Sequence, residues 1–343
     1  MIPYTWLNTG ALSPLLIAAS DMQSALAPAG RQAAEISQLW WLYLWVLTGV
    51  FALVAIALFF AILRRGPASA PLPAIEPVLA PSAATERRIS TAVIGCVAAT
   101  VLILFVLLFR DFIAGRSIDA LSGDKEFLSI KVIGHQWWWE VQYNDSAPSN
   151  VMVTANEMHV PVGKTIKLEL QSNDVIHSFW VPSMHGKKDL IPGYPTVAYF
   201  RADRAGTFRG QCAEFCGHQH AHMRLEFVAE SPEKFDQWLT AARQNAPVPA
   251  NEAQARGQQV FLSNQCIMCH TIEGTAARAT LGPDLTHLGS RQMLAAGAVP
   301  NTRGYLAGWI SNPQNIKPGA NMPPNPLSPD DLNALVDYLE SLK

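Results

Sequence analysis

The stretch Gln211–Met223, QCAEFCGHQHAHM, concentrates potential metal ligands in about a dozen residues. Its side chains include thiols, a carboxylate, imidazoles and a thioether. Soft donors of this kind suit copper better than calcium or magnesium. Cys212 and Cys216 are close enough to bind one centre, and His220 and Met223 follow after a turn. Two thiolates exceed what a mononuclear blue-copper site uses, so they could bridge two metal ions, with a disulfide as the alternative.

A second cluster of ligands, CIMCH, contains Cys266, Cys269 and His270. This spacing is typical of haem c attachment, in which two thiols add to the vinyl groups and the histidine binds the iron. A redox pair or half of a zinc site is the alternative. Met322, in the Gly/Pro-rich GANMPP, is the best candidate for the second axial ligand, and Met293 is its competitor. Thioether ligation raises a haem's potential, which suits electron transfer.

The chain is long enough for two or three domains, with 343 residues. Its net charge is −2 and it has no basic run, which excludes nucleic acid as a partner. Two apolar runs, Leu39–Leu63 and Ile89–Phe109, each exceed the roughly 20 residues that a membrane-spanning helix needs. They predict a transmembrane hairpin over residues 39–111.

Basic residues flank the loop between the two apolar runs, as is usual for cytoplasmic loops, so both ends of the hairpin should face outward. These residues are Arg64, Arg65, Arg87 and Arg88. The connector Gly66–Pro81 is rich in Pro and Ala and predicts irregular structure. Residues 1–38 form an N-terminal periplasmic segment in this topology. The apolar run Ala11–Ala19 predicts a signal peptide at 1–20, although no basic residue precedes it.

Alternating apolar residues beyond Gly123 predict strands, because side chains on a strand repeat with period two. They are Leu128, Ile130, Val132, Val151, Val153, Ile166, Leu168, Leu170, Leu225 and Phe227. Turn residues between them favour a small antiparallel sandwich or barrel over residues 124–229. His177, in SNDVIHSFWVP, follows an apolar strand and could approach the ligand-rich loop from a neighbouring strand.

After Phe227 a short amphipathic segment, Pro232–Arg243, gives way to Asn245–Asn251, whose Pro and Ala content is typical of a linker, so residues 230–250 are assigned to a linker. A third domain then covers residues 251–343. Its expected opening helix is Glu252–Ser263, directly before CIMCH, and its closing helix is Pro329–Leu342.

With these motifs in place, the chain resembles subunit II of the haem-copper cytochrome c oxidases, in the caa-type form with a fused cytochrome c domain. The resemblance covers nearly the whole chain: the hairpin, GHQWWWEVQY, NDVIHSFWVP, GKKDLIPG, the C-x-E-x-C-G-x-x-H-x-x-M loop and CIMCH. It implies a multidomain fold: an N-terminal transmembrane helix hairpin, a cupredoxin-like all-β barrel and a C-terminal all-α class I cytochrome c domain.

The resemblance also implies a binuclear CuA centre, in which each histidine binds one copper, the cysteines bridge both, and a thioether and a backbone carbonyl bind weakly. These ligands would be His177, His220, Cys212, Cys216, Met223 and Glu214. The Glu214 side chain would reach a magnesium ion shared with subunit I. Trp137 would be the residue through which electrons reach the copper, with a structural ring in the core or at an interface as the alternative.

One departure from the family concerns proton uptake. The family commonly begins its second helix with Glu-x-x-Trp-Thr-x-x-Pro, whereas this chain has ERRISTAVIG. Glu86 is out of register, so the sequence does not support proton uptake through it. No cysteine precedes Cys96, so an N-terminal lipid anchor is unsupported as well.

The expected function is electron input to a respiratory terminal oxidase in the bacterial inner (plasma) membrane, with the copper and haem domains on the periplasmic side. Electrons would pass from haem c to the copper pair and on to the haem of subunit I, which reduces oxygen and pumps protons. The expected partners are subunits I and III and an upstream donor such as a cytochrome c or a bc complex. The alternatives are the copper subunit of a nitric oxide reductase and a freestanding membrane-anchored electron carrier.

Overall fold

The computed structural model describes residues 22–64, 82–147 and 150–343. The predicted signal peptide at 1–20 and the connector 66–81 lie outside these ranges. The described residues form two compact units, one made of residues 35–119 and the other of residues 22–34 and 120–343.

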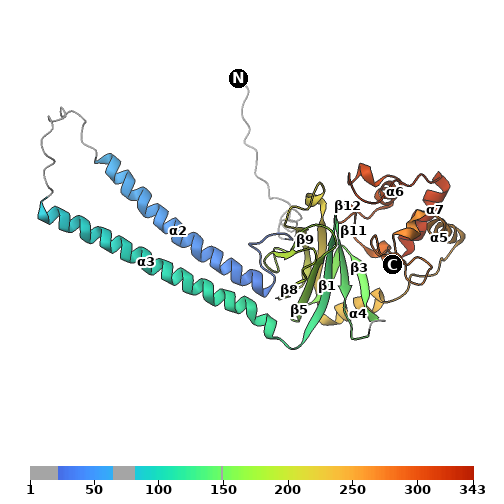
Figure 1. The fold of residues 1–343 in the computed structure, drawn as a ribbon, viewed down its shortest axis with the longest axis horizontal. Coiled ribbons are helices and arrows are strands. Elements are labelled where there is room, and N and C mark those ends of the chain that lie inside the picture. Colours follow the sequence, from blue (N-terminus) through green and yellow to red (C-terminus); the bar gives the residue numbers. More distant parts are fainter. Residues whose placement is uncertain (1–21, 65–81, 148–149) are drawn as a thin grey trace, which may run out of the picture. The chain divides into compact units, whose positions relative to one another are not determined.

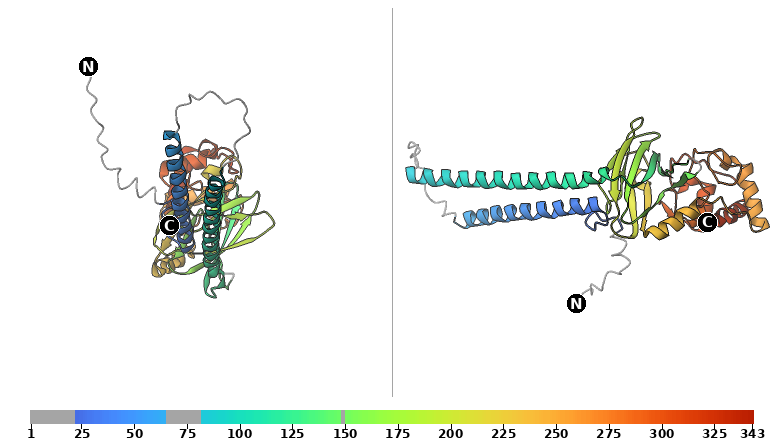
Figure 2. Two further views of the ribbon diagram at one scale, coloured as in Figure 1. Left: turned by 90° about the vertical axis from the view of Figure 1, so that its left-hand side faces the viewer. Right: turned by 90° about the horizontal axis from the view of Figure 1, so that it is seen from below.

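The smaller unit consists of two long helices, α2 (Arg31–Leu63) and α3 (Ala83–Asp119), which run side by side (Figures 1 and 2). Both are long and apolar enough to cross a membrane, and little of either apolar stretch is buried. The helices extend beyond the two predicted apolar runs. Flanking segments such as RQAAEISQ are good helix formers but too polar to count as part of a membrane span.

Two five-stranded sheets build the domain that follows, preceded by the short helix η1 (Ala120–Gly123). One sheet has the order β3-β2-β1-β5-β8 and the other β4-β10-β9-β6-β7. The strands are β1 (Phe127–His135), β2 (Trp138–Tyr143), β3 (Met152–Ala155), β4 (Glu157–Pro161), β5 (Thr165–Ser172), β6 (His177–Trp180), β7 (Lys188–Leu190), β8 (Thr196–Arg201), β9 (Gly206–Cys212) and β10 (Arg224–Glu230).

The sandwich differs from the prediction in one respect, because it is not purely antiparallel. In the described part of the chain β1 pairs with β5, and β4 with β10, in parallel, while the other neighbours pair antiparallel. Alternation with period two is the same in both orientations, so the sequence pattern could not distinguish them.

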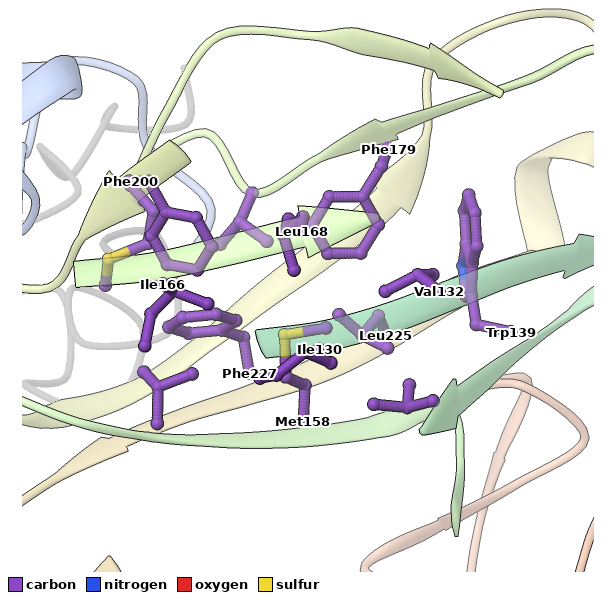
Figure 3. Close-up of a cluster of buried hydrophobic side chains, with 14 of the residues drawn as sticks. Ile130, Val132, Trp139, Met158, Ile166, Leu168, Phe179, Phe200, Leu225 and Phe227 are labelled. Atoms are coloured by element: carbon purple, nitrogen blue, oxygen red, sulfur yellow. The ribbon is translucent and has the colours of Figure 1, made fainter. Parts of the chain in front are cut away.

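The core lies between the two sheets (Figure 3). Ile130 and Leu168 point from one sheet toward Phe179 and Phe227 of the other, and all four are almost fully buried. Burying a side chain of this size stabilises a fold by roughly 1.5–3 kcal/mol. Strands β6 and β9 carry metal-ligand candidates. Because both strands contribute side chains to this core, the core fixes their positions.

Helix α4 (Pro232–Ala242) occupies much of the segment predicted as a linker. Ser231 caps its first turn by accepting a hydrogen bond from the Lys234 N–H. Phe235 is buried in the core of the sandwich, and the ring of Trp238 lies 5.2 Å from that of Tyr143. Its apolar face therefore makes α4 part of the sandwich domain.

The C-terminal domain is helical, with α5 (Glu252–Ser263), α6 (Arg303–Ser311) and α7 (Pro329–Ser341) (Figure 1). A Cβ on Gly257 of α5 would lie 2.0 Å from the Ala334 carbonyl oxygen of α7, so only glycine permits this close crossing. Shorter elements connect these helices: η4 (Gln265–Met268), η5 (Leu288–Ser290), β11 (Met293–Leu294), β12 (Val299–Pro300) and η6 (Pro313–Asn315).

Candidate metal centre and haem pocket

The ligand-rich loop joins β9 to β10 and includes the short helix η3 (His220–His222). A hydrogen bond of 3.0 Å from the Cys212 N–H to the Met223 carbonyl closes the loop at its base. His177 begins β6, which pairs with β9 so that Phe179 lies opposite Cys212. Sheet pairing therefore brings His177 to the loop, although the two are far apart in sequence.

The candidate copper ligands form a continuous cluster. The Cys212 sulfur lies 3.8 Å from His177 Nδ1 and 3.7 Å from the Cys216 sulfur. The Cys216 sulfur in turn lies 3.6 Å from His220 Nδ1 and 3.9 Å from the Met223 sulfur. His177, Cys212 and Cys216 place their ligand atoms within 4.8 Å of one another and are all buried. This soft donor set fits copper.

The two thiols are free in this structure, with their sulfurs much farther apart than the about 2.05 Å of a disulfide. The hydrogen bond between them lowers the pKa of Cys212 strongly. The same bond, together with burial, raises the pKa of Cys216. Because one buried sulfur is held negative beside the other, the pair favours a bound cation.

Asp174 orients His177, and sequence reasoning did not identify it. Its carboxylate lies 2.8 Å from His177 Nε2, which leaves Nδ1 facing the sulfurs. Burial alone would lower the pKa of His177, but the bonds to Asp174 and Cys212 outweigh it and raise the pKa. A Cβ on Gly134 would lie 2.7 Å from the imidazole, so glycine is needed there. The sequence signal that could have identified Asp174 is a polar residue three positions before a candidate histidine ligand.

Replacing Asp174 by asparagine tests this role. The amide keeps an acceptor near His177 but loses the negative charge, so copper affinity should fall about 10- to 100-fold, as for other outer partners of metal ligands. Competition with a copper chelator would measure the change. Asp189→Asn is the matched control, because Asp189 is an exposed residue on β7 of the same domain. Equal affinities in both variants would contradict the assignment.

Glu214 lies at the exposed tip of the loop. Its carbonyl oxygen is 3.2 Å from the Cys212 sulfur, whereas the Met223 sulfur contacts the other thiol, that of Cys216. Its carboxylate accepts a hydrogen bond of 3.2 Å from the Phe215 N–H. The backbone of Glu214 therefore faces the cluster, while its side chain is exposed.

The CIMCH segment lies on η4 and the turn after it, at the wall of a cavity of about 480 Å³. His270 Nδ1 donates to the Pro283 carbonyl at 2.7 Å, which leaves Nε2 free for a metal. Burial lowers the pKa of His270, which favours the neutral imidazole that binds iron. Cys266, Cys269 and His270 all line the cavity, so the residues present fit a covalently attached haem.

Both candidates for the second axial ligand, Met322 and Met293, line the same cavity. Met293 belongs to the β11–β12 hairpin, whereas Met322 lies in the loop between η6 and α7. Gln314 holds that loop by donating hydrogen bonds to the carbonyls of Ala320 and Met322.

Trp137 lies in the turn between β1 and β2 and reaches both sites. Its indole Nε1–H donates to the Cys216 carbonyl at 2.9 Å. The Gln136 side chain donates to the same oxygen at 2.7 Å. Trp137 is also part of the wall of the cavity that contains Cys266 and His270. The ligand-rich loop and the cavity beside CIMCH therefore share this side chain.

Comparison with known proteins agrees with this geometry. Family descriptions of the cytochrome c oxidase subunit II periplasmic domain and of cytochrome c match residues 145–230 and 254–343. Cytochrome c oxidase subunit 2 of Alkalihalophilus pseudofirmus is 35% identical over 324 residues, covering 93% of this chain and 91% of the relative. This chain belongs to the cytochrome c oxidase subunit 2 family. The predicted family and multidomain layout are confirmed.

Two further proteins named as subunit 2 or subunit II of cytochrome oxidases are similar to this chain. Subunit 2 of Bacillus subtilis is 30% identical, covering 75% of this chain and 74% of the relative. The structure of the periplasmic domain of subunit II from Bradyrhizobium japonicum has 33% identity and a TM-score of 0.33, covering 35% of this chain and 96% of that structure. Membership makes this chain a component of a cytochrome c oxidase and implies association with subunit I.

Proposed function

We propose that this chain is the electron-input subunit of a membrane-bound terminal oxidase. Electrons received in the cytochrome domain would pass through the copper domain to subunit I, where oxygen is reduced to water with proton pumping. The observation that supports this route most strongly is the position of Trp137, which contacts the Cys216 carbonyl and lines the proposed haem pocket. The two apolar helices would anchor the chain in the inner membrane, with both domains on the periplasmic side.

Each set of side chains has a distinct task in this proposal. The copper ligands would be His177, Cys212, Cys216, His220, Met223 and the Glu214 carbonyl. Bound copper and haem c supply one-electron storage. The sheets hold the ligands in a fixed arrangement, so the structure of the copper site should change little when the site is oxidised or reduced. Cys266 and Cys269 would attach the haem, with His270 and Met322 as its axial ligands.

The ligand-rich loop Gln211–Met223 is called the copper loop from here on. Its exposed tip is the proposed contact with subunit I. Phe215 is 75% exposed there, beside the exposed carboxylate of Glu214. An apolar ring next to a carboxylate suits a protein interface that also shares a hard cation such as magnesium. Subunit III and an upstream donor, such as a cytochrome c or a bc complex, complete the proposed assembly.

Purification of the membrane complex tests the proposal directly. Optical and electron paramagnetic spectra should show a mixed-valence copper pair and covalent haem c, copurifying with a haem-copper subunit. Oxygen consumption separates the oxidase from the alternative nitric oxide reductase. A chain isolated without any catalytic partner would instead favour a freestanding electron carrier.

Electron transfer from the attached haem to the copper should depend weakly on ionic strength. The cytochrome domain has nearly balanced charge, and Arg256 and Arg303 pair with acidic residues of α7. A tethered domain also needs no long-range steering, because its effective concentration is of order millimolar. Between about 10 mM and about 1 M salt, where the Debye length falls from about 30 to 3 Å, the stopped-flow rate should change less than about threefold. A steep fall would contradict this prediction.

A further inference from the structure

A three-residue stretch of the cytochrome domain, Lys317–Gly319, contacts the copper domain at every position. Lys317 Nζ donates to the Trp137 carbonyl at 2.7 Å. The Pro318 carbonyl accepts a hydrogen bond of 2.8 Å from the Gln219 side chain, within the copper loop. The backbone of Gly319 lies against the Trp137 ring, because a Cβ built there would be 3.5 Å from Cη2. This stretch closely precedes Met322 in the same loop.

The Lys317 ammonium group is fully satisfied by backbone carbonyls. Besides Trp137, it donates to the His222 carbonyl at 2.8 Å and the Ala295 carbonyl at 3.0 Å. An ammonium has three N–H donors, so these three acceptors use all of them. The side chain is 3% exposed, and no carboxylate of the described residues lies within ion-pair distance of it.

The acceptors come from separate parts of the fold. Trp137 lies in the β1–β2 turn and His222 in the copper loop, whereas Ala295 belongs to the β11–β12 hairpin of the cytochrome domain. The ammonium can therefore reach all of them only when the two domains are docked in this register.

Docking removes a positive charge from water, and burial lowers the pKa of Lys317 to about 7. The net gain in docking free energy should therefore be small. A shifted register, however, would leave the same charge buried without acceptors, which is strongly unfavourable. Lys317 should therefore determine which docked arrangement forms, while adding little to the free energy of docking.

We propose that Lys317 is the positioning residue that fixes the cytochrome domain against Trp137. It would hold the loop between η6 and α7, which contains Gly319 and Met322, on the indole ring. This inference rests on the proposed function, because it concerns the route between the two sites. Other contacts also cross the interface, including a hydrogen bond of 3.0 Å from the Arg224 N–H to the Ala296 carbonyl. Loss of the ammonium should therefore loosen the register without separating the domains.

Lys317→Met in the full, copper- and haem-loaded chain is the test, because methionine retains an apolar stem and loses the donors. Two quantities are measured: hydrogen exchange of the backbone amides in residues 135–139 and 217–223, and the rate of haem-to-copper electron equilibration after photoreduction. Exchange should rise at both segments. The rate should fall about tenfold or more, since small misplacements of reacting groups can cost up to a hundredfold.

Lys343→Met is the matched control, because Lys343 is an exposed lysine of the same domain. It should change neither quantity, and the haem and copper spectra of both variants should match the parent chain, which shows that both domains have folded. If Lys317→Met leaves either the exchange or the rate unchanged, the positioning role is overturned. Absence of electron equilibration in the parent chain would refute the proposed function instead, while the exchange measurement would still test the docking.

Discussion

Replacement of Cys216 by serine should abolish the spectrum of the copper pair and leave the covalent haem intact. Cys216 is the central member of the ligand cluster, with the sulfurs of Cys212 and Met223 and the imidazole of His220 all within 3.9 Å of its own sulfur. A serine hydroxyl is a hard and weakly acidic donor, so it cannot replace a bridging thiolate. Because the side chain is almost fully buried, water cannot supply a substitute ligand easily.

Copper content and the electron paramagnetic spectrum of the purified complex measure this effect. Cys266→Ser is the reciprocal control, because it removes a proposed haem-attachment thiol in the other domain and should leave the copper signal unchanged. Cys96→Ser, which changes the exposed cysteine of α3, should alter neither centre. Retention of the copper signal in Cys216→Ser would mean that the ligands are misassigned.

Trp137→Phe should slow electron transfer from the haem to the copper on the order of a hundredfold, while both cofactors remain bound. Phenylalanine preserves an apolar ring at this 8% exposed position but removes the indole N–H that donates to the Cys216 carbonyl. Gln136 still donates to that carbonyl, so the loop should keep its fold. The smaller ring would also lose contact with the loop that contains Gly319.

Trp138→Phe is the matched control for Trp137→Phe. Trp138 adjoins Trp137 and lines the same cavity, but its ring stacks on His135 at 4.2 Å, with no hydrogen bond to the copper loop among the described contacts. Photoreduction of the haem in the oxidised complex would give both rates, because the oxidised copper then accepts the electron. If the two variants slow the transfer equally, Trp137 is a structural ring and not the route to the copper.

Motifs that are local in sequence determined much of this account. The C-x-E-x-C-G-x-x-H-x-x-M loop and CIMCH provide most of the proposed ligands, because the members of each motif lie within one turn or loop. Glu252–Ser263 forms a helix with the predicted bounds, and in the structure the Asn251 side chain caps it by accepting a hydrogen bond from the Gln254 N–H. Period-two alternation likewise located β1, β3, β5 and β10, because side chains on one face of a strand recur at every second residue.

Contacts between distant segments were decided only by the tertiary structure. Alternation does not encode strand partners, so the parallel pairing of β1 with β5 and the approach of β6 to β9 had to come from the fold. The same is true of α4, whose short apolar face has a place only once the sandwich exists. Lys317 gave no signal in the sequence, because its acceptors are backbone carbonyls, which every residue has. Sequence fixes which chemical groups are present, whereas packing decides which of them meet.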